Sequence, residues 1–355
     1  FKQKTAYEIA SCLVGSEMCI RDRCTTLNMN QKYIIAGSKS GKITCWDVDS
    51  GKENWNIDVN GPISELSLSD EIYVTASAEL HAIETESGKL KWSIDIQGSS
   101  DLVYVDDDFV YVTSSLYEIE IEDYTETTLF QFDKNGNLNW KIEFEEKPWF
   151  IGKISGEIIL GIGRPRCGYL SVNEKSNISH WQIEESPVNM GITTNLGFLL
   201  GHSNGIVVES INGKIRKFQC GNDPISAMNS NNESWQVGDK NGRILTSENI
   251  EVELDGSIDS ILESERFFWV STSTNGNLVY LLDKKNGSIK YQFSHRSRIR
   301  FMRLIDNNLT MSDDEGMIML FDLDRLDKKI ESKNEEVEDL ERRNLLKKRL
   351  RELRG

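Results

Sequence analysis

Three stretches of the chain share one pattern and decide the fold: VDSGKENWNI (residues 48–57), TESGKLKWSI (85–94) and DKNGNLNWKI (133–142). Each contains a polar turn that ends in glycine, and a tryptophan follows four residues later. Two later stretches, SINGKIRKFQ (210–219) and DKKNGSIKYQF (283–293), keep the turn but lack the tryptophan. The pattern indicates an internal repeat, which has to be recognised before any single motif is interpreted.

The period of the repeat follows from its turn glycines, which are separated by 37, 48, 77 and 74 residues. The last two separations are close to twice 37, so we expect one degenerate copy inside each, at NEKSNISHWQI (173–183) and SENIEVEL (247–254). The separation of 48 indicates an insertion, which falls at IEDYTETTLF (121–130). The turn glycines are Gly51, Gly88, Gly136, Gly213 and Gly287.

Each repeat contains four short β-rich runs joined by turn signals. Asn-Gly dipeptides, such as Asn135-Gly136, favour tight hairpins because glycine accepts the positive φ that such turns require. A four-stranded antiparallel sheet cannot bury both of its faces alone, but neighbouring sheets stacked around an axis can bury them for each other. The sequence therefore predicts an all-β protein, a β-propeller of about eight four-stranded blades, with seven as the alternative.

The last repeat has only three candidate strands, at 299–306, 308–314 and 317–324. In many propellers an N-terminal segment supplies the missing strand and closes the ring, and here it would lie just before Cys24. Residues 1–23, however, resemble translated sequencing adaptor, most clearly over Lys2–Glu8 and Leu13–Asp22. We interpret 1–23 as non-native sequence, so an export signal in the native N-terminus would not be visible. The propeller is assigned to residues 24–324.

Two repeats, CWDVDSGKENW (45–55) and HAIETESGKLKW (81–92), resemble the PQQ-like propeller repeat. The segment AGSKSGKITCWDVDSGK (36–52), with its Trp46-Asp47 pair, also resembles a WD40 repeat. The resemblance covers residues 31–324 and implies that the repeat tryptophans are structural and pack between blades. We assign this structural role, together with the turn glycines, to Trp46, Trp55, Trp92, Trp140 and Trp181.

The resemblance also raises the possibility of catalysis, because quinoprotein dehydrogenases share this fold. Such enzymes need a quinone pocket with a calcium ion at the axis, and many use a pair of adjacent cysteines, which this sequence lacks. The four histidines fall in different repeats without metal-ligand spacing, and no nucleophile or phosphate-loop motif occurs. We expect a non-catalytic chain with no catalytic residue, no cofactor and no metal site.

The functional expectation is a scaffold that mediates protein–protein interaction through loops on the faces of the ring. Two alternatives remain open: a PQQ-like propeller that holds a small ligand or has a redox role, and a periplasmic factor of envelope assembly. The partner is not identifiable from the sequence. A formal net charge of −16 argues against nucleic acid as the partner, and no apolar run is long enough to span a membrane. The spacing of Cys24, Cys45, Cys167 and Cys220 suggests no disulfide framework, which favours the cytoplasm.

The C-terminal region, residues 325–355, is rich in Glu, Lys, Arg and Leu, and predicts a charged helix. Residues 331–341 contain six acids, whereas 342–354 contain seven basic residues and one acid. Three interpretations compete: a helix or tail on the propeller, a coiled coil with itself or a partner, and a basic end that contacts nucleic acid or a membrane surface. A homo-oligomer could therefore form through 325–354. The heptad-like apolar positions are Leu323, Leu326, Ile330, Val337 and Leu340.

Overall fold

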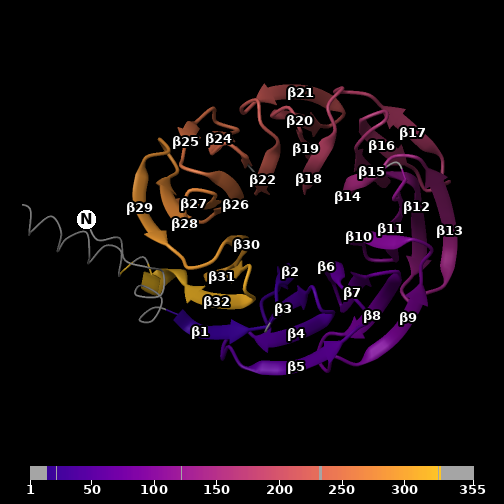
Figure 1. The fold of residues 1–355 in the computed structure, drawn as a ribbon, viewed down its shortest axis with the longest axis horizontal. Helices are drawn as coiled ribbons and strands as arrows, with labels where there is room; N and C mark the ends of the chain where they lie inside the picture. Colours follow the sequence, from indigo (N-terminus) through magenta and orange to yellow (C-terminus); the bar gives the residue numbers. More distant parts are fainter. Residues whose placement is uncertain (1–13, 21, 121, 232–233, 327, 329–355) are drawn as a thin grey trace, which may run out of the picture.

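The computed structural model describes residues 14–20, 22–120, 122–231, 234–326 and 328. Its 32 strands form eight four-stranded antiparallel sheets arranged around one axis, so the structure is an eight-bladed β-propeller (Figure 1). We number the blades along the chain: blade 1 contains β2–β5, each later blade takes the next four strands, and blade 8 contains β30–β32 together with β1. The prediction of eight blades is confirmed.

The inner strand of each blade faces the axis, and the second strand pairs with it. Second strands are buried almost without interruption because neighbouring blades cover both of their faces. The inner strands are β2 (Cys24–Met29), β6 (Ile63–Leu68), β10 (Ser99–Val105), β14 (Pro148–Ile154), β18 (Val188–Thr194), β22 (Ile225–Ser230), β26 (Ser257–Glu263) and β30 (Ile299–Ile305). The second strands are β3 (Tyr33–Ser38), β7 (Glu71–Ala76), β11 (Phe109–Glu118), β15 (Glu157–Ile162), β19 (Gly197–His202), β23 (Trp235–Asp239), β27 (Phe267–Ser273) and β31 (Asn308–Asp313).

The third strand is also largely buried, whereas the outer strands of blades 1 to 3 alternate between exposed and half-buried residues, as expected at the rim. The third strands are β4 (Lys42–Asp47), β8 (Glu79–Glu84), β12 (Asp123–Asp133), β16 (Gly168–Val172), β20 (Ile206–Ile211), β24 (Arg243–Thr246), β28 (Leu278–Asp283) and β32 (Met317–Asp322). The outer strands are β5 (Glu53–Asp58), β9 (Leu90–Asp95), β13 (Leu138–Phe144), β17 (Ile178–Trp181), β21 (Lys214–Gln219), β25 (Glu251–Glu253), β29 (Ile289–Ser294) and β1 (Val14–Cys19).

The hydrophobic core lies between the blades. The buried apolar residues of the described chain form eight clusters, and each cluster draws on two neighbouring blades. Between blades 1 and 2, for example, Ile35 and Ile43 pack with Ile72 and Val74. Burying a side chain of this size contributes about 1.5–3 kcal/mol, so the stacking of blades is what stabilises each sheet.

Blade 8 is closed by β1, which pairs with β32 in the register Met18↔Ile318 and Cys19↔Met317. The ring is closed at the position expected for an N-terminal strand, but residues 14–19 of the segment that resembles adaptor supply it. The expectation that blade 8 lacks its fourth strand is therefore wrong for this chain. Strand pairing uses backbone N–H and C=O groups, so any segment without proline can form the hydrogen bonds of an outer strand. In addition, the Met18 side chain is buried at the junction between blades 8 and 1.

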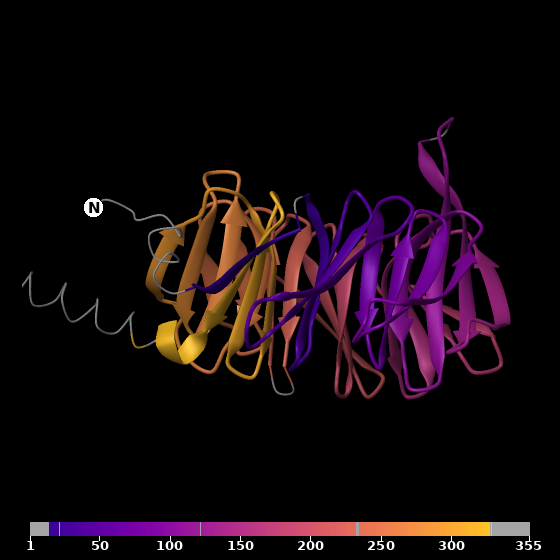
Figure 2. The ribbon, with the colours of Figure 1, turned by 90° about the horizontal axis from the view of Figure 1, so that it is seen from below.

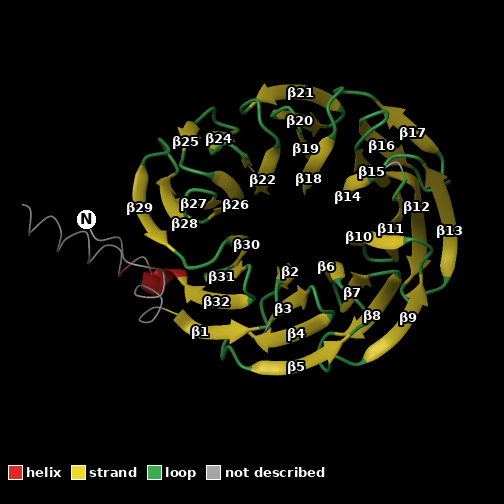
Figure 3. Cartoon of the chain, viewed as in Figure 1, coloured by secondary structure: helices red, strands yellow, loops and turns green. Residues whose placement is uncertain are grey.

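After β32 the chain enters a short helix over residues 323–326 (Figure 3). Leu323 and Leu326 are buried in the cluster between blades 7 and 8, where they pack with residues such as Trp269. The first two positions of the predicted heptad pattern therefore belong to the propeller core. Ile330, Val337 and Leu340, with the rest of the predicted helix, lie outside the described residues. Within the described ranges, no helix has the length and apolar composition needed to cross a membrane.

Candidate functional site

The repeat tryptophans and glycines form contacts between consecutive blades. Trp55 of β5 lies against Gly88 in the turn of blade 2, and its Nε1 donates a hydrogen bond of 2.9 Å to the Thr85 carbonyl oxygen. Trp92 of β9 repeats this contact on Gly136 in blade 3, and its Nε1 donates to the Lys134 carbonyl oxygen at 3.1 Å. These residues have a structural place in the ring.

The other repeat residues occupy related positions. Trp46 is buried between blades 8 and 1, and Trp140 packs on the cluster between blades 3 and 4. Gly287 of blade 7 contacts Val252 of blade 6, so valine stands there in place of tryptophan. Gly51 has a φ of +63°, and its amide donates to the Asp47 carbonyl oxygen at 2.8 Å.

Trp181 departs from the expected packing between blades. Its side chain is 51% exposed and stacks on Tyr169 of the same sheet, with ring centroids 6.1 Å apart. The reason lies in the next turn, which in blade 5 is a tight Asn212-Gly213 pair. A Cβ on Gly213 would meet no atom within 4 Å, so no indole from blade 4 lies against it.

The inner strands of all eight blades line an axial cavity of about 880 Å³. Three arginines from one edge of blade 8, Arg298, Arg300 and Arg303, contribute to its wall. The acids in the lining are Glu65 of β6 and Asp259 of β26. The charged side chains of the wall are therefore these three arginines and two acids, contributed by blades 2, 7 and 8.

Two of the arginines have acidic partners. Arg298 Nη2 donates to Asp259 Oδ1 at 2.5 Å, and Arg300 Nη1 donates to Asp314 Oδ1 at 3.3 Å. Arg298 Nε and Asp259 Oδ2 are both buried, and neither has a hydrogen-bond partner in the part of the chain that the structure describes. At the wall of the cavity, this pair therefore has one N–H group that could still donate and one carboxylate oxygen that could still accept a hydrogen bond.

Arg303 and Glu65 face each other across the wall without a direct ion pair. Arg303 Nη1 donates to the Met302 carbonyl oxygen at 3.0 Å, and Glu65 Oε2 accepts the Val103 amide at 2.8 Å. Glu65 is half-buried at the wall of the cavity, deep within the ring, and its carboxyl group loses hydration there. This loss of hydration raises the pKa of Glu65 to about 7, although the Val103 amide and the charge of Arg303 act in the opposite direction.

The donor set of the cavity does not fit a calcium-held quinone. Such a site needs several carboxylate and amide oxygens around one ion. Asp259 is instead tied to Arg298, and Glu65 faces Arg303. No group of three or more His, Cys, Asp or Glu side chains able to hold a metal occurs among the described residues.

A second feature is the hairpin of β11 and β12, which is longer than its counterparts and rises from one face of the ring (Figure 2). It lies where the repeat spacing indicates an insertion. The partner strands end at its base, because β10 pairs with β11 only as far as Ser115, and β13 pairs with β12 only from Thr127. Beyond this point the two strands pair only with each other, through Leu116↔Glu126, Tyr117↔Tyr124 and Glu118↔Asp123.

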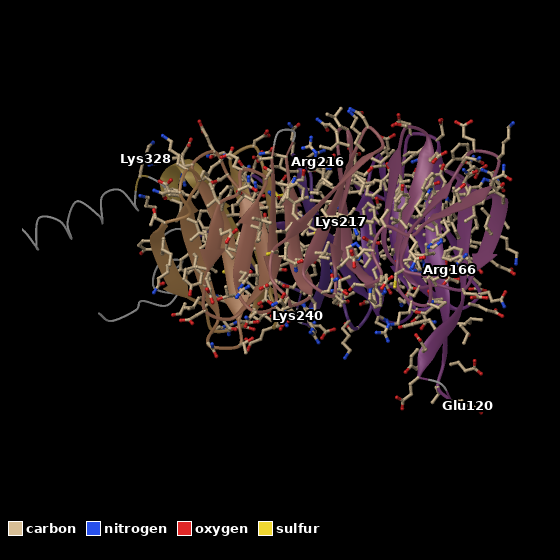
Figure 4. The ribbon with its side chains drawn as sticks, turned by 90° about the horizontal axis from the view of Figure 1, so that it is seen from above. Glu120, Arg166, Arg216, Lys217, Lys240 and Lys328 are labelled. Atoms are coloured by element: carbon tan, nitrogen blue, oxygen red, sulfur yellow. The ribbon has the colours of Figure 1, made fainter. Side chains whose placement is uncertain are left out.

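The projecting part of the hairpin exposes large apolar side chains. Ile119 is 81% exposed and Tyr117 is 53% exposed, and the Tyr117 and Tyr124 rings contact edge to face at 5.1 Å. The side chain of Glu120 extends at the tip (Figure 4). Sequence reasoning located the insertion but did not single out these residues, although the alternation of Tyr117, Ile119 and the acids between them was a usable signal.

A lysine fixes the base of the hairpin to the ring. Lys147 Nζ lies 3.8 Å from the centroid of the Tyr124 ring and forms an ion pair of 3.0 Å with Asp101 Oδ1. The same ammonium lies 5.2 Å from the ring of Trp149, which is 47% exposed beside it. A cation between two aromatic rings holds the hairpin in a defined orientation.

Comparison with known proteins gives a family match over part of the chain and several structures with the same fold. Residues 67–161 match the family model described as outer membrane protein assembly factor BamB. A comparison with curated proteins finds no match. The matched part spans blade 2, blade 3 with its hairpin, and the start of blade 4.

Several solved structures share the fold at low sequence identity. The computationally designed Ika8 protein aligns with a TM-score of 0.71 and 13% identity, over 85% of this chain and 97% of that one. Sqt1 from Saccharomyces cerevisiae aligns with a TM-score of 0.68 and 12% identity, over 86% and 97%. BamB from Moraxella catarrhalis aligns with a TM-score of 0.66 and 13% identity, over 86% and 98%. The repeat pattern and the eight four-stranded sheets identify the described chain as an eight-bladed β-propeller, and residues 67–161 within it are similar to the PQQ-like repeat family.

Proposed function

We propose that this protein is a non-catalytic scaffold that binds a protein partner through the β11–β12 hairpin. The observation that carries the proposal is the exposure of Ile119 and Tyr117 on a ribbon that projects from the ring. A two-stranded ribbon has no second layer to cover its apolar side chains. Exposed aromatic and large aliphatic side chains on a rigid support are typical of the anchors of protein interfaces.

The rigidity of the ring supports this role. Eight interlocked core clusters hold the blades, and Lys147 holds the base of the hairpin between Tyr124 and Trp149. A pre-ordered binding element loses little conformational entropy when a partner docks, which favours affinity. The family whose model matches residues 67–161 is described as an assembly factor, which agrees with a role in binding other proteins.

The proposed compartment is the cytoplasm. Cys24, Cys45 and Cys167 are buried free thiols and Cys220 is a half-buried one, so none of the four forms a disulfide. Burial raises the pKa of the Cys45 thiol to about 12, which keeps it protonated and unreactive at neutral pH. Unpaired thiols are common in reducing compartments. The family description favours envelope assembly instead, and fractionation of cells that make the protein decides between the two compartments.

The partner-binding proposal is tested by placing a photoreactive amino acid at Ile119 in cells that make the protein. Leu196 is a matched control position, since it is an exposed apolar residue on a turn of blade 5, outside the hairpin. We expect a discrete covalent adduct with a protein from position 119 and none from position 196. Equal labelling at both positions, or no protein adduct at either, contradicts the proposal.

The axial cavity supports a second candidate function, binding of a small anion. The supporting observation is the row of Arg298, Arg300 and Arg303, in which Arg303 donates a hydrogen bond to the Met302 carbonyl oxygen and forms no ion pair among the described residues. Guanidinium groups in such a setting bind carboxylate or phosphate. Citrate and inorganic phosphate are suitable probes, and the expected increase in melting temperature should disappear in Arg303→Gln. No increase in the wild-type protein removes this candidate.

A further inference from the structure

We propose that the hairpin, through residues 117–120 and 122–126, binds the basic segment 342–354 of a second copy of this chain. The inference rests on the proposed function of the hairpin as a binding element and names its occupant. Self-association of this kind differs from a coiled coil between two C-terminal segments. It joins two unlike surfaces, one on the ring and one at the end of the chain.

The projecting part of the hairpin exposes an apolar surface. Tyr117 and Ile119 are exposed by more than half, and the Tyr117–Tyr124 ring pair extends this surface toward the base. Beside the base, Trp149 adds a half-exposed indole. A segment that brings leucine side chains to this surface would bury area that the hairpin cannot bury by itself.

The projecting part of the hairpin is also strongly acidic. Between residues 116 and 126 the sequence contains five acids and no basic residue. Glu118 and Asp123 stand directly opposite each other in the ladder, an arrangement in which like charges repel and destabilise the pair. A ligand with several positive charges would relieve this repulsion. The five acids are Glu118, Glu120, Glu122, Asp123 and Glu126.

The composition of the proposed occupant complements that of the hairpin. Residues 342–354 read RRNLLKKRLRELR, with seven basic residues, one acid and four leucines. This segment therefore offers positive charge for the acids of the hairpin and leucine side chains for its exposed apolar residues. Charge complementarity of this kind steers association and selects the partner. The preceding residues, 331–341, are acidic and would be repelled by the hairpin, so the register of binding is defined.

The positions of the hairpin and of the end of the described chain favour a second copy as the source of the basic segment. The described chain ends at Lys328, beside blade 8, and the hairpin belongs to blade 3. Lys328 and Glu120 lie at opposite ends of the ring and on opposite faces of it (Figure 4). A segment from the same copy would have to cross the whole ring, whereas a second copy can place its hairpin next to the segment. The contact is heterologous, so repetition gives a closed ring of copies or an open chain.

The test uses two full-length variants with neutral substitutions. The hairpin variant carries Glu118→Gln, Glu120→Gln and Glu126→Gln, and the tail variant carries Arg342→Gln, Arg343→Gln, Lys347→Gln and Lys348→Gln. A control variant, Asp49→Asn with Glu248→Gln, removes two exposed acids far from the hairpin. All three hairpin positions are exposed, so the ring should fold normally, and circular dichroism and melting temperature check this.

Light scattering and sedimentation then measure mass against protein concentration. We expect the wild type and the control to self-associate at low salt, and to dissociate toward monomer at about 1 M NaCl, where the Debye length is about 3 Å. Each of the two variants should associate at least about tenfold more weakly, because three or more exposed ion pairs are lost. An equimolar mixture of the two variants should form a one-to-one dimer and nothing larger, because only one intact hairpin–tail contact is available.

Three results would overturn the inference. A wild type that stays monomeric throughout excludes a second copy as the occupant. A hairpin variant that self-associates like the wild type points to pairing between C-terminal segments. A mixture that forms no dimer shows that the two surfaces do not recognise each other. In all three cases a protein adduct at position 119 would still support the scaffold proposal, so the failures of the two proposals are distinguishable.

Discussion

Trp55 and Gly88 lie in contact across the junction of blades 1 and 2. A Cβ on Gly88 would come within 2.6 Å of Trp55 Cδ2, so only glycine leaves room for the indole. The Nε1 of the same indole donates a hydrogen bond to the Thr85 carbonyl oxygen in that turn. The glycine of one repeat and the tryptophan of the preceding repeat are therefore one structural device.

Substitution of Gly88 by alanine should lower the stability of the protein through two effects, backbone strain and a clash with Trp55. Gly88 has a φ of +71°, so alanine is strained by about 1–2 kcal/mol, and the clash with Trp55 should add about 1–3 kcal/mol. Gly213→Ala is the matched control, because its φ is +75° but its Cβ would meet no atom within 4 Å. Urea denaturation of both variants measures the difference. Equal losses of stability would show that the Trp55 contact contributes nothing.

Truncation of two repeat tryptophans should have unequal effects. Trp55→Ala removes an indole that is packed between blades and hydrogen-bonded, and should destabilise the protein by about 2–4 kcal/mol. Trp181→Ala removes an indole that is half exposed on its own sheet, and should cost less than about 1 kcal/mol. Melting temperatures of the two variants test this order. A larger loss for Trp181→Ala would contradict the assignment of Trp181 to the surface.

The raised pKa of Glu65 should make the stability depend on pH in a defined direction. The folded protein binds this proton more tightly than the unfolded chain, so stability from this group falls as the pH rises from about 4.5 to about 7, and is flat above that. Glu65→Gln, which resembles the protonated acid, should therefore become more stable relative to the wild type over this range, by about 1–3 kcal/mol.

The measurement is the difference in melting temperature between Glu65→Gln and the wild type at pH 5 and pH 8. Burial lowers the pKa values of His81 and His202, which makes stability rise with pH in the same region, but this contribution is common to both proteins and cancels in the difference. A difference that stays constant with pH would show that the Glu65 carboxyl group keeps its ordinary pKa.

The sequence predicted the parts of the fold that repeat. Turn glycines such as Gly88 and Gly136 show the period directly, because the φ they adopt excludes most other residues. The degenerate copies were recoverable for the same reason: Ser176 and Asn249, which have positive φ, stand where two of the missing glycines were expected. The same turn position needs a positive φ in successive blades, so the repeat can be recognised from a single sequence.

The candidate sites were harder to predict because they depend on where separate strands meet. Arg303 and Glu65 are far apart in sequence, and each resembles an ordinary polar residue on an amphipathic strand until the ring brings them to the axis. The hairpin was detected only as extra length at 121–130. Trp181 fits the repeat pattern, but its packing depends on a turn in the next blade, which carries Gly213 in a different geometry.

The closed ring is the central claim, since it fixes the places of the cavity and the hairpin, and one engineered disulfide tests it directly. Cys19 of β1 lies opposite Met317 of β32, so Met317→Cys should form a cross-strand disulfide with Cys19 under mild oxidation and raise the melting temperature. Ile318→Cys is the control, because Ile318 pairs with Met18 and points to the other face of the sheet. Mass spectrometry of the non-reduced protein should find the bond in the first variant alone. No bond in either variant, or a bond in the control, would contradict the closure of the ring by β1.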